Sequence, residues 1–220
     1  MRIRPLYLIQ SFLILAAALV GASSSQAAAF SVHSYELGER IALTNGTRVW
    51  TARFDVSVES LVSHVPSFCV DVYTAIGVGE YTTRDVLDAD SAVAPVGERA
   101  RNFAWAGHVM ENFGNDVASL VSSGISRAQA ITGVQAAIWQ GIYGGNTINR
   151  YSLSTGARHV FDDIMRSSVE GSSDTWIAEF RGVQDQVFVR PTNPIPEPSA
   201  ALVFGLGMVV AGSVLRRRAD

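Results

Sequence analysis

The chain has 220 residues, of which 48% are hydrophobic, and its 17 basic and 20 acidic residues give a formal net charge of −3. Without the two terminal segments described below, the central part carries a net charge of −6. That charge makes nucleic acid and anionic lipid headgroups poor partners for this part of the chain.

The N-terminus has the three parts of a secretory signal peptide. Arg2 and Arg4 form a basic region, residues 12–20 are apolar, and the small residues of 25–29 offer a cleavage site. We therefore expect residues 1–29 to be removed on export. The remaining residues, 30–190, number about 160, which suits a single domain with a substantial core.

The middle of the chain changes from strand-like to helical patterns. Residues 30–81 are rich in strand-forming segments, two of which meet at the turn-forming pair Asn45-Gly46. Residues 98–168 have helical patterning with a break at Gly114, and residues 184–190 resemble a closing strand. This order predicts an α+β fold over 30–190, with an antiparallel sheet or sandwich and an inserted helical subdomain.

Cys69 is the single cysteine of the chain, so it cannot form an intrachain disulfide. It is a buried structural residue, a site for an intermolecular bond, or a reactive group. Residues 68–73 alternate as in a strand, which predicts Cys69, Asp71 and Tyr73 on one face and three apolar residues on the other.

A helix is predicted from Ser126 to the stop signal at Gly144-Gly145. Ser126 and Gln129 fit a capping box, and apolar residues recur at three- and four-residue spacing. Gln135 falls within this apolar stripe. A buried amide without partners costs about 1–3 kcal/mol, so this glutamine needs a hydrogen-bonding partner or a chemical role.

Two segments together resemble a known family. Phe68-Cys69-Val70-Asp71 and, further on, Val134-Gln135-Ala136-Ala137-Ile138-Trp139 are similar to the two halves of the motif in bacterial surface thioester domains. The resemblance covers about 68–143. It implies that Cys69 and Gln135 join in an internal thioester, with loss of ammonia, which reacts once with an amine-bearing partner. The chain itself has no lysine to consume such a bond.

The residues around this pair have expected roles that follow from their positions. Phe68, next to the sulfur, and Trp139, one turn after Gln135, would exclude water, while Asp71 or Tyr73 would assist proton transfer. The family's long stalks have no counterpart here, because one domain lies close to the C-terminal membrane segment. A partner within the bacterium's own envelope or matrix fits that arrangement.

The C-terminal tail begins with a proline-rich linker, 191–198, followed by an uncharged apolar segment, 199–215. As a helix this segment would be about 25 Å long, near the lower limit for crossing a hydrocarbon core of roughly 30 Å. Three arginines follow it and would remain on the cytoplasmic side. We therefore predict a transmembrane helix with a basic stop over 199–218.

The order of these parts closely resembles the PEP-CTERM sorting signal of Gram-negative bacteria. The matching residues are Pro196, Glu197, Pro198, Arg216, Arg217 and Arg218. The resemblance implies recognition by an exosortase-type protease and a location in the envelope or at the cell surface. A membrane anchor that is never processed is the alternative.

Other chemistries have little support in the sequence. His33, His64, His108 and His159 lack the spacing of metal ligands, so no metal site is predicted, and we expect no cofactor. A cysteine-protease dyad of Cys69 with His108 or His159 lacks the flanking signature of such enzymes. Two functions remain open: single-turnover covalent coupling without enzymatic catalysis, and a non-reactive envelope or matrix protein with a buried structural cysteine.

Overall fold

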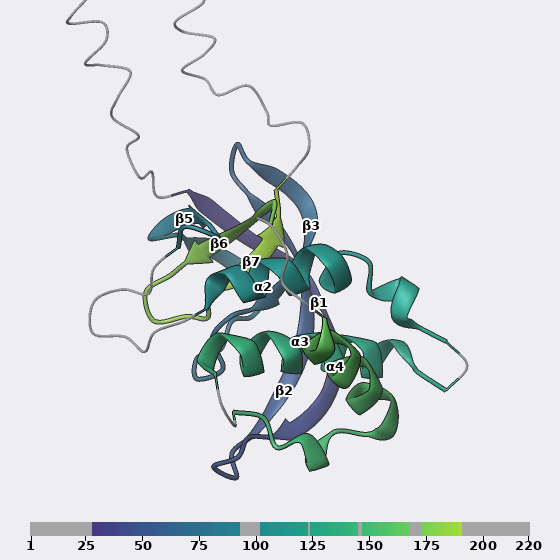
Figure 1. Ribbon diagram of the computed structural model, residues 1–220. Coiled ribbons are helices and arrows are strands. Elements are labelled where there is room, and N and C mark those ends of the chain that lie inside the picture. The colour runs from purple at the N-terminus through teal and green to yellow at the C-terminus, as the bar shows by residue number, and fades with distance from the viewer. Residues whose placement is uncertain (1–27, 93–101, 123, 145–146, 168–172, 191–220) are drawn as a thin grey trace, which may run out of the picture.

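The computed structural model describes residues 28–92, 102–122, 124–144, 147–167 and 173–190 (Figure 1). Most of the predicted signal peptide and the whole tail after residue 190 lie outside these ranges. Among the described residues, no helix is both long enough and apolar enough to cross a membrane. The elements in chain order are β1 Ala29–Ala42, β2 Arg48–Val58, β3 Val62–Cys69, β4 Gly79–Thr82, β5 Asp85–Asp88, α2 Phe103–Val109, the π-helix η1 Met110–Gly114, the 3₁₀ helix η2 Val117–Leu120, α3 Arg127–Tyr143, the 3₁₀ helix η3 Arg150–Ser152, α4 Thr155–Arg166, β6 Thr175–Glu179 and β7 Gln186–Val189.

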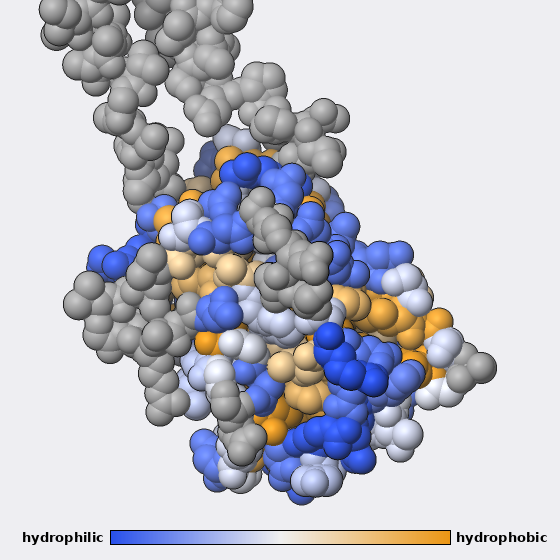
Figure 2. All heavy atoms as spheres, in the orientation of Figure 1, coloured by the Kyte–Doolittle hydropathy of each residue, from blue (hydrophilic) through white to orange (hydrophobic). Residues whose placement is uncertain are grey.

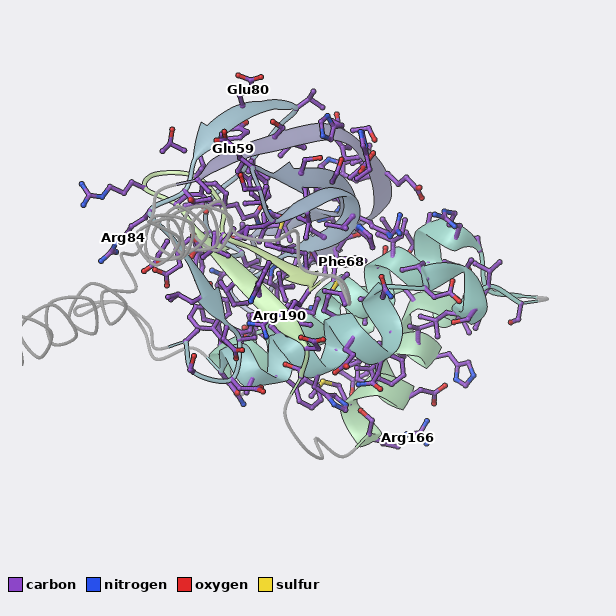
Figure 3. All side chains as sticks on the ribbon, turned by 90° about the horizontal axis from the view of Figure 1, so that it is seen from above. Glu59, Phe68, Glu80, Arg84, Arg166 and Arg190 are labelled. Carbon is purple, nitrogen blue, oxygen red and sulfur yellow. The ribbon has the colours of Figure 1, made fainter. Side chains whose placement is uncertain are left out.

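The strands form one antiparallel seven-stranded sheet in the order β4-β1-β2-β3-β7-β6-β5. β5 pairs with β6, so the helical segments between these two strands are an insertion in the sheet. Seen from above, the molecule separates into a layer of strands and a layer of helices (Figure 3). The fold is therefore of the α+β class, and the helices interrupt the strand order.

The sheet curls, because aromatic rings from strands that are far apart in its order touch one another. Phe30 of β1 and Phe180, just after β6, have ring centroids 4.9 Å apart and an edge-to-face geometry. Phe188 of β7 lies 6.5 Å from Phe30 in the same cluster. The concave side of the sheet thus has an aromatic core of its own, and the helices cover the other side.

Helix α3 lies at the centre of the molecule and is buried almost all round, from Ala130 to Trp139. Ser126 and Gln129 form the predicted capping box, and the helix stops before Gly144, whose φ of 64° favours glycine. Against the sheet, Thr132 hydrogen-bonds to Thr51 of β2 at 2.9 Å. Contact this close requires Gly38, since a Cβ there would come within 2.2 Å of the Thr51 hydroxyl.

Two sequence-based expectations need correction. β3 ends at Cys69, so 70–73 do not continue the strand, because Asp71 folds the chain into a turn. No strand was expected at β5 or at β6, which lie outside the predicted strand regions 30–81 and 184–190. The turn at Asn45-Gly46, the break at Gly114 and a strand within 184–190 are confirmed.

Candidate functional site

Cys69 is the last residue of β3, and it lies where the sheet and α3 meet. It is 3% exposed, and its neighbours Phe68 and Val70 are fully buried. The strand is therefore covered on both faces at this point, whereas the sequence predicted one apolar face. The sulfur is enclosed by protein on every side except where the side chain borders a pocket, described below.

Gln135 of α3 bonds to the main chain of Cys69 with both ends of its amide. Its Oε1 accepts a hydrogen bond from the Cys69 N–H at 3.1 Å, and its Nε2 donates to the Cys69 carbonyl at 2.7 Å. The register of β2 with β3 stops one residue earlier, at Arg53 and Phe68. The amide thus takes the place that the next peptide group of β2 would have occupied, and it satisfies both polar groups of a buried residue.

The sulfur has a second glutamine as its partner. Gln186 of β7 lies opposite Cys69 in the sheet and donates from Nε2 to Sγ at 3.2 Å. The hydroxyl of Ser67 donates to Oε1 of Gln186 at 2.8 Å and fixes the orientation of that amide. Burial raises the pKa of the Cys69 thiol well above its usual value, the bond from Gln186 lowers it, and the charges of Asp71 and Asp185 raise it again.

Asp71 and Tyr73 do not adjoin the sulfur in the expected way. The Asp71 carboxylate accepts hydrogen bonds from the Tyr73 N–H, the Thr74 hydroxyl and the Tyr143 hydroxyl. It therefore holds the turn that ends β3. Tyr73 is 56% exposed and packs edge-on against Tyr143, with ring centroids 5.6 Å apart. The charge of Asp71 acts on the Cys69 thiol by raising its pKa, and a role of either residue in proton transfer stays a prediction.

Phe68 and Trp139 differ in how they relate to the sulfur. Neighbouring residues of a strand point to opposite faces, so the Phe68 side chain lies on the face away from that of Cys69. The ring of Phe68 packs against Gly114 of η1, and the residue lies between the strands and the helices in Figure 3. Trp139 is 2% exposed and borders the same pocket as Cys69. Trp139 is thus placed to shield the sulfur, and Phe68 is not.

The pocket next to Cys69 has a volume of about 520 Å³. Its walls come from β1 and β2, from residues 74–77, and from Cys69, Trp139 and Gln184. The Gln184 side chain donates a hydrogen bond to the carbonyl of Asp71, so the turn after β3 is tied to the wall of the pocket. We call this cavity the Cys69 pocket. Cys69 is one of the residues that line it.

The histidines lie apart from this site. His108 contacts Ser167 and Asn112, and His159 pairs with Asp163 at 3.6 Å. Neither contact involves the sulfur, so the cysteine-protease alternative gains no support. Among the described residues, no group of three or more His, Cys, Asp or Glu side chains is placed to bind a metal ion.

Sequence reasoning missed Gln186, Ser67 and the rim of the Cys69 pocket. Gln186 lies 117 residues from Cys69 and reaches it only through the pairing of β3 with β7. An alternating pattern places residues on one face of a strand but does not identify the neighbouring strand. The available signal was Gln186, a polar residue next to the apolar run 187–189 of the closing strand.

Comparison with known proteins identifies no family for this chain. No protein-family model matches it, and no curated protein is similar to it at a significant level. One solved structure that resembles it is the N-terminal thioester domain of fibronectin-binding protein SfbI from Streptococcus pyogenes, with 9% sequence identity and a TM-score of 0.47, covering 78% of this chain and 97% of that chain. A likeness at this level does not assign a fold or a function to this chain.

Proposed function

We propose that Cys69 and Gln135 form an internal thioester through which this protein couples covalently, once per molecule, to an amine-bearing partner. The observation that carries the proposal is the docking of the Gln135 amide on the main chain of Cys69 inside the core. The two sequence motifs that contain these residues support the same pairing. Holding two reacting groups together lowers the barrier by about 7–11 kcal/mol in favourable cases.

Formation of the bond is a transfer of the Gln135 acyl group from nitrogen to sulfur. Sγ of Cys69 attacks Cδ of Gln135, the C–N bond breaks, and the thiol proton leaves with the nitrogen as ammonia. The negative charge that develops on Oε1 is met by the Cys69 N–H, which already donates to that oxygen. Because the proton moves to the departing nitrogen, no buried thiolate has to persist, which agrees with the raised pKa of the Cys69 thiol.

Coupling reverses the role of the sulfur. A primary amine attacks Cδ of Gln135, the C–S bond breaks, an amide forms, and a proton from the amine ends on the Cys69 sulfur. In this step the N–H of Gln186 stabilises the charge on the departing sulfur, since it donates to Sγ. Gln186 therefore acts on the reacting sulfur directly, and Trp139 limits access of water to the bond. Each molecule reacts once, so the protein is not an enzyme.

The place of action follows from the sequence of the two termini. The signal peptide directs export, and the tail with Pro196, Glu197 and Pro198 is read by an exosortase-type protease at the membrane. The partner is then an amine-bearing component of the envelope or matrix. The Glu197→Ala variant should leave full-length protein in the membrane fraction. A variant in which Arg216, Arg217 and Arg218 are replaced by glutamine should do the same. Unchanged size and location in both variants would reduce the tail to a plain anchor.

Methylamine tests the coupling reaction directly. Wild-type protein incubated with methylamine should gain one methylamide, mapped by peptide mass spectrometry to Gln135, and one titratable thiol at Cys69. Cys69→Ala and Gln135→Ala should both be inert. Gln140→Ala changes a glutamine on the same helix outside the site and serves as the matched control, so it should react as wild type does. Absence of a methylamide, or its appearance at Gln186, would overturn the proposal.

A second function is favoured by one observation. Cys69 is buried and its sulfur already has a hydrogen-bond donor, as in a structural cysteine. In that case the protein is a non-reactive envelope or matrix component, and Gln135 simply satisfies the main chain of β3. A thiol that reacts with maleimide only after unfolding, in a protein of unmodified mass, would establish this alternative.

A further inference from the structure

The Cys69 pocket has an apolar rim that projects into solvent. Tyr35 is 48% exposed, Leu37 50% and Trp50 58%, and all three line the pocket. Three of the seven exposed large hydrophobic side chains among the described residues thus surround a single cavity. Grouped exposure of this kind marks a binding surface more often than single exposed residues do.

The rim residues belong to one face of neighbouring strands. Tyr35 and Leu37 of β1 pair with Phe54 and Ala52 of β2, and Trp50 continues the same face. Phe54 pairs in turn with Ser67, whose side chain shares a face with that of Cys69. A continuous apolar surface therefore leads from the exposed rim to the sulfur. It lies on the face of β1 and β2 opposite to Thr51, which contacts α3, and Trp139 of that helix lines part of the pocket.

The described residues that line the pocket include no ionic group to receive a charged ligand. None of the residues that line it is an aspartate, glutamate, arginine or histidine, and its polar members are neutral side chains such as Thr74 and Gln184. An ammonium group moved into such surroundings loses its hydration without gaining a counter-charge. The neutral form of an amine, which is the nucleophilic form, is therefore the form that this pocket accepts.

The pocket wall also contains a donor without an acceptor. Nε1 of Trp139 is buried and has no hydrogen-bond partner among the described residues. Buried donors are nearly always paired, so this one is an unusual feature of the wall, but the atom itself is not exposed to the pocket. The volume of about 520 Å³ lies within the range typical of small-molecule sites.

We propose that the Cys69 pocket is the acceptor site of the coupling reaction and that it selects primary amines carried on an uncharged, apolar stem. This inference rests on the proposed thioester and adds the class of its substrate. The stem lies against Trp50, Leu37 and Tyr35, and the amine reaches the site where Cys69 and Trp139 meet.

The test compares two amines of equal length. n-Hexylamine carries an apolar stem, and 6-aminohexanoate carries the same stem with a carboxylate at its far end. Rates of adduct formation with wild-type protein, followed by intact mass, should favour n-hexylamine by at least about tenfold, because its terminal methyl group can be buried and the carboxylate in the same place cannot. Trp50→Ala should remove most of this preference. Tyr151→Ala changes an aromatic residue that is 84% exposed and does not line the pocket, so it should keep the preference.

The outcomes separate this inference from the thioester proposal. Equal rates for the two amines, in a protein that does form adducts, would overturn the pocket assignment and leave the thioester standing. A wild-type mass without any ammonia deficit would overturn the thioester. The pocket is then tested alone with the Cys69→Ala variant, by titrating its tryptophan fluorescence. Tighter binding of n-hexylamine than of 6-aminohexanoate supports the site, and equal binding overturns it.

Discussion

The amide of Gln135 bonds to Cys69 through both main-chain groups of that residue, although 66 residues separate the two in sequence. The contact fixes the end of β3 against α3 whether or not the sulfur reacts. The contact therefore stabilises the packing of β3 on α3, and it also holds together the two side chains that would react. Variants at this pair must be chosen to separate these two effects.

Gln135→Ala in a Cys69→Ala background tests the structural consequence, since no thioester can form there. The change leaves the N–H and carbonyl of residue 69 buried without partners, so the free energy of unfolding should fall by about 1–3 kcal/mol. Urea denaturation measures this loss. Gln140→Ala in the same background is the control, because Gln140 is only partly buried and accepts its bonds from a loop. Equal losses of unfolding free energy in the two variants would mean that the hydrogen bonds of Gln135 to residue 69 add no particular stability.

Gln186→Met tests the hydrogen bond to the sulfur. Methionine preserves much of the side-chain volume but cannot donate to Sγ, so the departing sulfur loses its stabilisation. We expect the rate of methylamine coupling to fall by about tenfold. Ser67→Ala, which frees the Gln186 amide, should reduce the rate by a smaller factor. If coupling in Gln186→Met proceeds at the wild-type rate, Gln186 has only a packing role.

The Gln135→Ala variant keeps Cys69 as a thiol and allows its titration to be followed. The pKa of this thiol is raised in the folded state, and the ordinary value is 9.0. Stability from this group is therefore complete below that pH and is lost as pH rises above it, because only the unfolded chain ionises. Relative to Cys69→Ala/Gln135→Ala, the single variant should lose up to about 1.4 kcal/mol per pH unit above 9.0. Parallel pH profiles would show an unperturbed thiol.

Two variants of Trp139 separate the contribution of its ring to stability from that of its indole N–H group. Trp139→Phe removes the Nε1 donor and keeps a smaller aromatic ring, so the free energy of unfolding should fall by only part of the loss in Trp139→Ala. Trp139→Ala leaves a cavity in the core and should cost about 3–5 kcal/mol. Thermal or urea unfolding measures both. A large loss in Trp139→Phe would mean that the indole N–H is hydrogen-bonded in the native protein.

Local signals in the sequence predicted the helix that carries Gln135 and the strand that carries Cys69, but not all the neighbours of these two residues. The caps of α3 are set by Ser126, Gln129 and Gly144, which act within one helical turn, and they were predictable. The end of β3 was not predicted, because the strand-like alternation of 68–73 continues past it, and the Asp71 side chain that forms the turn is also bonded to Tyr143, 72 residues away. Phe68 was assigned to the sulfur by sequence adjacency, although strand alternation separates the two side chains.

The surface gives a further example of what sequence patterning leaves out. The helical side of the molecule shows hydrophobic areas between hydrophilic ones, including an area at the right of the view near the segment after α2 (Figure 2). The rim of the Cys69 pocket is assembled from β1 and β2 by their pairing. Tyr35 and Trp50 are ordinary strand residues in sequence, and only the register brings them together.

The intact mass of the purified, folded wild-type domain tests the central claim most directly. If Cys69 and Gln135 are joined, the mass falls short of the calculated value by one ammonia. Cys69→Ala and Gln135→Ala then have their full calculated masses, and the native wild-type protein has no titratable thiol. A wild-type mass equal to that of the unmodified chain, with one thiol titrating after denaturation, would contradict the thioester and leave Cys69 as a buried structural residue.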